Sequence, residues 1–190
     1  MIRKPYETTW LDLANRALAR LNMNLIKSFD EGSNSALQAE LCLSDSVSEV
    51  LNTNDWKSAT KRTVVMPLTE QTVDGQYVYS FPPDFIRLVS VNRDKEYWSR
   101  EGHGLVSPLR EEFVISYVAY PEIPGTLDPI LQSAIALMAA YKMSLVLTAD
   151  TTLQQQLFSE ANMAISTARI NEKQGEPDIL ISTNDWKKEY

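Results

Sequence analysis

His103, flanked by Gly102 and Gly104, is the single histidine and therefore the first candidate for proton transfer near neutral pH. In a loop, a histidine can act as a general base when a nucleophile and a carboxylate lie beside it. The sequence has no nucleophile elbow, P-loop, H-E-x-x-H or C-x-x-C string that places such partners. We therefore interpret His103 as a solvent-facing loop residue, and Gly-His-Gly as too short a string for a dinucleotide site.

A pair of adjacent carboxylates, Glu111 and Glu112, raises a second chemistry, glycoside hydrolysis. That reaction uses two carboxyl groups on either side of one bond, one of them with a raised pKa. Adjacent residues in a strand point to opposite faces, so these two carboxylates are not expected to share a substrate. We interpret them as exposed charges that precede a strand.

Nucleic-acid binding has weak support in the composition. Stacking platforms interleave aromatic residues with Lys and Arg, and the four tryptophans and eight tyrosines of this chain lack that pattern. The formal net charge of −7 also disfavours a tight grip on DNA, although a protein can surround DNA without holding it. We assign the aromatic residues to cores and interfaces.

Metal and cofactor sites are not expected. Cys42 is the single cysteine, so the chain has no internal disulfide, and one cysteine with one histidine does not make the usual zinc site. Arg3 and Lys4 are followed by no apolar stretch, so we expect no signal peptide and synthesis in a cytosol. The prediction is a protein with no catalytic, cofactor-binding or metal-binding residues.

Four segments have helical spacing of apolar residues and must supply most of the scaffold. They cover Thr9–Leu21, Asn34–Leu51, Asp128–Thr148 and a segment from about Asp150 to Gly175. Asp128 before Pro129 is a strong helix start, with a capping side chain and a proline at the first helical position. Lys142 and Ser144 interrupt this third segment, which falls short of the ~20 apolar residues of a bilayer span, so no membrane segment is predicted.

Between the helical segments, residues 61–121 have short strand-like runs. These runs are Thr63–Met66, Tyr77–Phe81, Ile86–Val91 and Phe113–Val118, with turn signals at 74–75, 82–83 and 102–104. We predict a mainly α fold: an antiparallel four-helix-type bundle with an inserted small antiparallel β-sheet domain and an extended C-terminal tail. The expected parts are a helical pair (1–60), the β insertion (61–121), a helical hairpin (122–175) and a docking tail (176–190).

The tail is too short for a core of its own, yet it contains Ile179, Leu180, Ile181 and Trp186. We predict that these four residues bind a partner. The string T-N-D-W-K occurs at 53–57 and again at 183–187. Shared turn chemistry is our interpretation of this repeat, and the alternative is that both tryptophans fill similar grooves.

Several strings, in order, resemble the tail tubular protein A family of podoviruses, the head-to-tail adaptors beneath the portal. The strings are A-L-A-R-L at 17–21, D-W-K-S-A-T-K-R at 55–62, Y-V-Y-S-F-P-P-D-F at 77–85, and Tyr117–Pro121 leading into the apolar helix. The resemblance spans nearly the whole chain. The chain departs from the pattern at Asn22, where glycine is expected, and at Phe81, where leucine is usual.

The resemblance implies a structural virion protein made in the host cytoplasm: a ring of about twelve copies between the portal and the tail nozzle or tube, through which DNA passes. The tail residues are then expected to contact the portal or a neighbouring subunit, and Trp56 and Arg62 to serve folding or subunit contact. We expect a monomer in isolation, because a ring interface that closes weakly needs the portal as a template. The alternatives are a virion-associated cell-wall hydrolase and an unrelated regulatory or scaffold protein.

Overall fold

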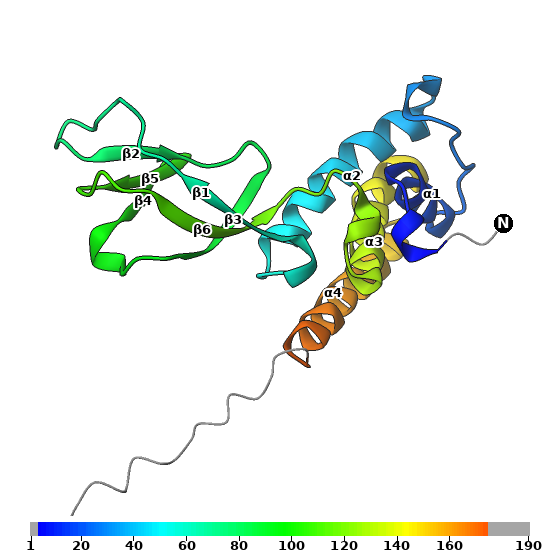
Figure 1. Cartoon of the computed structure of the whole chain (residues 1–190). Helices are drawn as coiled ribbons and strands as arrows, with labels where there is room; N and C mark the ends of the chain where they lie inside the picture. Colours follow the sequence, from blue (N-terminus) through cyan, green and yellow to red (C-terminus); the bar gives the residue numbers. More distant parts are fainter. Residues whose placement is uncertain (1–3, 175–190) are drawn as a thin grey trace, which may run out of the picture.

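The computed structural model describes residues 4–174, which form a helical layer and a β part that projects from one end of it (Figure 1). The four helices are α1 (Trp10–Arg20), α2 (Asn34–Asn52), α3 (Pro129–Thr148) and α4 (Thr151–Gln174). Their starts are the ones predicted, because capping side chains are present: Thr9 and Asp12 form a capping box at α1, and Asp128 caps α3. Asn22, just after α1, has a φ of 56°, which explains why glycine is expected there.

Helix α3 is the centre of the helical layer. It packs against α1, α2 and α4, whereas α2 and α4 make no extensive contact with each other. Its length and apolar composition are those of a membrane span, and 56% of its most apolar 18-residue stretch is buried inside the fold. Packing against three helices therefore accounts for its apolar composition.

The β part contains two antiparallel sheets. The junction sheet has the order β1-β6-β3 and the distal sheet the order β2-β5-β4. Their strands are β1 (Thr60–Val65), β2 (Tyr77–Ser80), β3 (Phe85–Val91), β4 (Ser99–Glu101), β5 (Gly104–Ser107) and β6 (Phe113–Ala119).

The predicted fold class was wrong. The helices pack around a central α3, and the β part has two three-stranded sheets instead of one small sheet. With 51% helix and 19% strand in the described part of the chain, the fold is α with β and not mainly α. Strands β4 and β5 were missed because β4 is short, polar and exposed, while β5 is buried along its whole length and shows no alternation. The predicted extended tail lies outside the described residues.

Strand β6 joins the two halves of the molecule. Val118 packs in the helical core, whereas its neighbours Tyr117 and Ala119 pack in a second core between the two sheets. This division follows from the alternation of side chains along a strand. Near Val118 the junction sheet is therefore covered on both faces, and this direct packing fixes the β part to the helical layer.

Candidate functional site

His103 lies in the tight turn between β4 and β5, where its side chain is exposed. Gly102 has a φ of 53°, and a Cβ on Gly104 would lie 2.2 Å from the Tyr79 carbonyl oxygen. Both glycines are thus required by the hairpin, one for its left-handed backbone and one for close approach to β2. This geometry explains the Gly-His-Gly string without a role for the imidazole.

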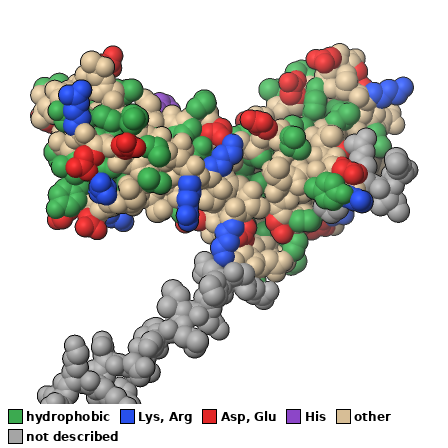
Figure 2. Space-filling view, in the orientation of Figure 1, with side chains coloured by type: hydrophobic (Ala, Val, Ile, Leu, Met, Phe, Trp, Pro, Cys, Tyr) green, Lys and Arg blue, Asp and Glu red, His purple; other side chains and the backbone are tan. Residues whose placement is uncertain are grey.

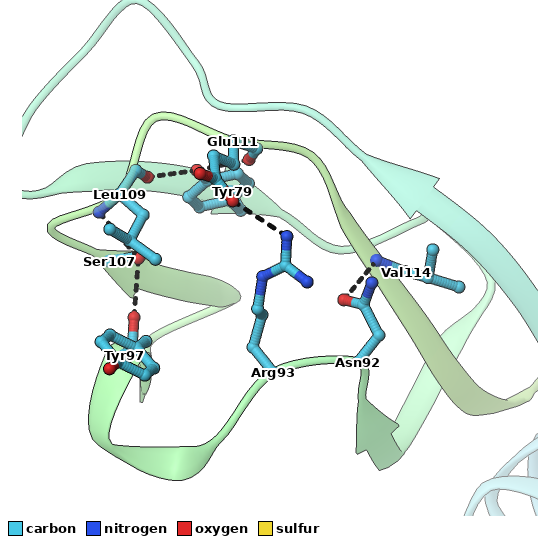
Figure 3. A network of polar contacts seen from close by, with 8 residues as sticks. All are labelled: Tyr79, Asn92, Arg93, Tyr97, Ser107, Leu109, Glu111 and Val114. Atoms are coloured by element: carbon cyan, nitrogen blue, oxygen red, sulfur yellow. Dashed lines mark hydrogen bonds and ion pairs between the residues drawn. The ribbon is translucent and has the colours of Figure 1, made fainter.

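Glu111 belongs to a polar network that holds the loop before β6 (Figure 3). The buried Tyr79 hydroxyl lies 2.6 Å from the Leu109 carbonyl oxygen and 2.8 Å from that of Glu111, while the Glu111 carboxylate pairs with Arg93 at 2.9 Å. Glu112 is exposed beside it, one residue before β6 begins. The two carboxylates lie at the surface, and Glu111 is already engaged by Arg93.

Neighbouring contacts fix the same end of the β part. Ser107 donates to the Tyr97 carbonyl oxygen at 2.7 Å and accepts from the Leu109 amide at 3.0 Å (Figure 3). Asn92 accepts from the Val114 amide at 3.0 Å. Within residues 4–174, no group of three or more His, Cys, Asp or Glu side chains is arranged to hold a metal ion.

The first T-N-D-W-K string forms the connection between α2 and β1. Trp56 is fully buried and donates its indole N–H to the Val50 carbonyl oxygen at 3.0 Å. Asp55 pairs with Arg87 of β3 at 3.0 Å, and Lys57 Nζ donates to the Glu172 carbonyl oxygen of α4 at 3.1 Å. The string thus ties α2, β3 and the end of α4 together. Its second copy, with Trp186, lies outside the described residues, as do Ile179, Leu180 and Ile181.

Beside this connection, Asp84 accepts hydrogen bonds from Lys61 Nζ at 2.7 Å and from the Tyr117 hydroxyl at 3.0 Å. Partial burial raises the pKa of the Asp84 carboxyl, but the two hydrogen bonds outweigh it, and the net pKa is lowered. Burial and the hydrogen bond to Asp84 raise the pKa of Tyr117 to about 12. The hydrogen bond to Asp84 also raises the pKa of Lys61.

Arg62, next along β1, is exposed and has no ion pair with any described residue. The outward side of β1 around it is apolar and uncovered. Val64 is 50% exposed, Met66 is 62% exposed, and Val114 lies opposite Val64 on β6. Polar and apolar groups on β1 are therefore both available to a partner.

Two surface hollows meet at Ser58, in the 3₁₀ turn η3 (Lys57–Ala59) that leads into β1. One hollow, of about 230 Å³, lies against the end of α4 at Ala168, Asn171 and Glu172. The other, of about 300 Å³, lies at the start of β1, beside Ile123. The Ser58 Oγ atom is buried and has no hydrogen-bond partner among residues 4–174.

The outer surfaces of α2 and α4 expose apolar side chains. On α2 these are Leu37 and Leu41, and on α4 they are Phe158, Met163 and Ile170. Leu37 and Phe29 also line a hollow of about 430 Å³ with Glu40. Both helices pack on α3 and make no extensive contact with each other, so these exposed side chains belong to two separate helices of the layer.

Charge is distributed without a continuous basic surface on the face shown in Figure 2, where Lys and Arg alternate with Asp and Glu. Residues 30–56, which include α2, contain no Lys, Arg or His. They contain six carboxylates: Asp30, Glu31, Glu40, Asp45, Glu49 and Asp55. The surface of α2 is accordingly apolar and acidic.

Neither a family model nor a curated protein matches this chain. Three surface features of the chain are therefore the candidates for function. They are the uncovered side of β1, the hollows at Ser58 and the apolar surfaces of α2 and α4. Sequence reasoning did not identify Ser58, Lys61, Asp84 or Tyr117. Asp84 is part of the Y-V-Y-S-F-P-P-D-F string, and its place in that string could have identified it as a candidate.

Proposed function

We propose that the chain is a structural head-to-tail adaptor of a tailed phage, which assembles as a ring of about twelve subunits between the portal and the tail nozzle or tube. In this proposal it is a virion protein without enzymatic activity, and DNA passes through the ring. Support comes from the order of the quoted strings and from the surfaces described above.

The observation that carries the proposal is the pair of apolar surfaces on α2 and α4. In a closed ring each subunit contacts its two neighbours through two different surfaces. Leu37 and Leu41 on α2, and Phe158, Met163 and Ile170 on α4, are the candidates for two such surfaces. Exposed apolar side chains that gather on a helix surface are typical of a protein–protein contact.

The shape of the chain also suits an adaptor. The β part projects from one end of the helical layer (Figure 1), so a ring built through the helices presents its β parts as a separate tier. One tier can then contact the portal and the other the tail. A net charge of −7, without a continuous basic surface on the face in Figure 2, fits a wall along which DNA slides.

Portal binding by Ile179, Leu180, Ile181 and Trp186 is part of the proposal and is tested by changing those residues in the full chain. Replacing the three aliphatic residues with serine should abolish co-sedimentation with the cognate portal ring. A matched variant, with serine at Thr183, Asn184 and Lys188, should bind as the parent does. Equal binding by both variants would show that these tail residues do not contact the portal.

The alternative of a cell-wall hydrolase has a direct assay. Purified chain is applied to a gel that contains peptidoglycan, with lysozyme as the positive control. The adaptor proposal predicts no cleared zone. A cleared zone that is lost in His103→Ala would instead support an enzyme.

A further inference from the structure

The outer edge of β1 is one of the free sheet edges of the β part. The junction sheet has the order β1-β6-β3, and all six residues of β1 pair with β6, from Thr60 opposite Val118 to Val65 opposite Phe113. Among residues 4–174, no strand lies on the other side of β1. A six-residue edge of this kind is a template for a further strand, and proteins usually cover it.

The chain leaves the helical layer close to this edge. Glu172, two residues before the end of α4, contacts Lys57, three residues before β1 begins. The two hollows at Ser58 extend from Asn171 and Glu172 on α4 to Thr60 and Lys61 on β1. Because the two hollows share Ser58, they mark a path from the last turn of α4 to the first residues of β1.

The residues that follow α4 suit this path. Gly175, Glu176 and Pro177 can span about 10 Å when extended, enough to pass Ser58. Ile179–Thr183 follows, a run of mostly β-branched residues with high strand propensity.

The side chains along the edge also match that run. Val64 and Met66 offer exposed apolar surface on β1, and Ile123 offers it in the hollow at the start of β1. Arg62 is exposed and has no ion pair with any residue from 4 to 174, and Asp178 directly precedes the apolar run. Apolar contacts and one charge pair are thus both available.

We propose that residues 178–183 add a strand to the outer edge of β1 in the same chain, while residues 175–177 cross the path at Ser58. The added strand enters at the start of β1 and runs parallel to it. This pairing covers the free edge in the isolated subunit. Because the edge is covered within the chain, the free subunit stays monomeric. In the adaptor proposed above, the same run is released to the portal on assembly.

Amide hydrogen exchange on the isolated full chain tests the pairing without any portal. In Leu180→Pro/Ile181→Pro the run cannot donate its hydrogen bonds, and the outward-facing amides of β1 should exchange about tenfold faster. Lys187→Pro/Lys188→Pro, with two prolines outside the run, should leave their exchange unchanged. Equal exchange in the parent and both variants would overturn the proposal.

Disulfide trapping distinguishes pairing within one chain from pairing between chains. In a Cys42→Ser background, Val64→Cys is combined in turn with a cysteine at each of residues 179–183. Strands side by side bring at least one pair of Cα atoms within about 7 Å, the reach of a disulfide. The proposal predicts a cross-linked monomer for at least one pair. Disulfide-linked dimers alone, or no cross-link at any position, would contradict it.

Discussion

Asp84 and Tyr117 are joined by a 3.0 Å hydrogen bond at the point where the β part meets the helical layer. Because burial and this bond raise the pKa of Tyr117 to about 12, the neutral phenol is favoured in the fold. Its contribution to stability is complete below the ordinary tyrosine pKa, about 10, and is lost as pH rises through about 12. We therefore expect the free energy of unfolding to fall between these two pH values.

Tyr117→Phe should reduce that alkaline fall, because the side chain no longer titrates. Urea unfolding at a series of pH values measures the effect, and Tyr97→Phe, on a partly exposed tyrosine, is the control. An alkaline fall of the same size in the parent and in Tyr117→Phe would show that another group is responsible.

Asp84 gives the opposite dependence on the acid side. Its pKa is lowered in the fold, so its contribution is present above the ordinary aspartate pKa and is lost as pH falls through the folded value. Asp84→Asn should therefore flatten the loss of stability below about pH 4. The exposed Asp74→Asn should leave the acid profile unchanged.

The Tyr79 hydroxyl should stabilise the loop before β6. Tyr79→Phe leaves the carbonyl oxygens of Leu109 and Glu111 without their buried donor, at a cost of about 1–3 kcal/mol. Tyr97→Phe, in the same network region, should change the unfolding free energy by less than about 0.5 kcal/mol, because only its backbone carbonyl oxygen is used. Urea denaturation of both variants measures the difference, and equal stability would contradict the role given to Tyr79.

The hairpin at His103 gives a matched pair of variants. Gly104→Ala places a methyl group 2.2 Å from the Tyr79 carbonyl oxygen and should destabilise the fold by about 1–3 kcal/mol. His103→Ala, one residue away and exposed, should be within about 0.5 kcal/mol of the parent. A large loss of stability in His103→Ala would reveal a role for the imidazole that the geometry does not explain.

Ring formation should depend on both apolar helix surfaces. Leu41→Asp on α2 and Met163→Asp on α4 should each reduce the number of subunits bound to the portal by about tenfold or more, because a charge is placed in an apolar contact. Val73→Asp, at a fully exposed apolar residue of the β part, should bind normally. Sedimentation with portal rings measures the bound fraction. Normal binding by both helix variants would exclude these surfaces as ring contacts.

The helices were predictable because their signals are local. Thr9 with Asp12, and Asp128 with Pro129, are capping patterns that a few adjacent residues define, and the structure confirms both starts. The arrangement of the helices was not predictable, since nothing in the spacing of α2 and α4 shows that both pack on α3 and not on each other.

The candidate site was harder to predict, because its contacts join distant residues. Lys61, Asp84 and Tyr117 meet through the register of β1 and β6 and the return of the chain before β3. Ser58 stands out only once the end of α4 is placed beside it. Trp56 was singled out from the sequence, but its bond to Val50 depends on how α2 ends.

A ring subunit of the proposed kind should assemble on a portal. Mass photometry of the purified chain, alone and mixed with its cognate portal ring, measures this assembly. We expect a monomer of 21.5 kDa in isolation and a discrete portal complex heavier by about twelve subunits. A portal mass that does not change at micromolar concentrations of the chain would contradict the adaptor function.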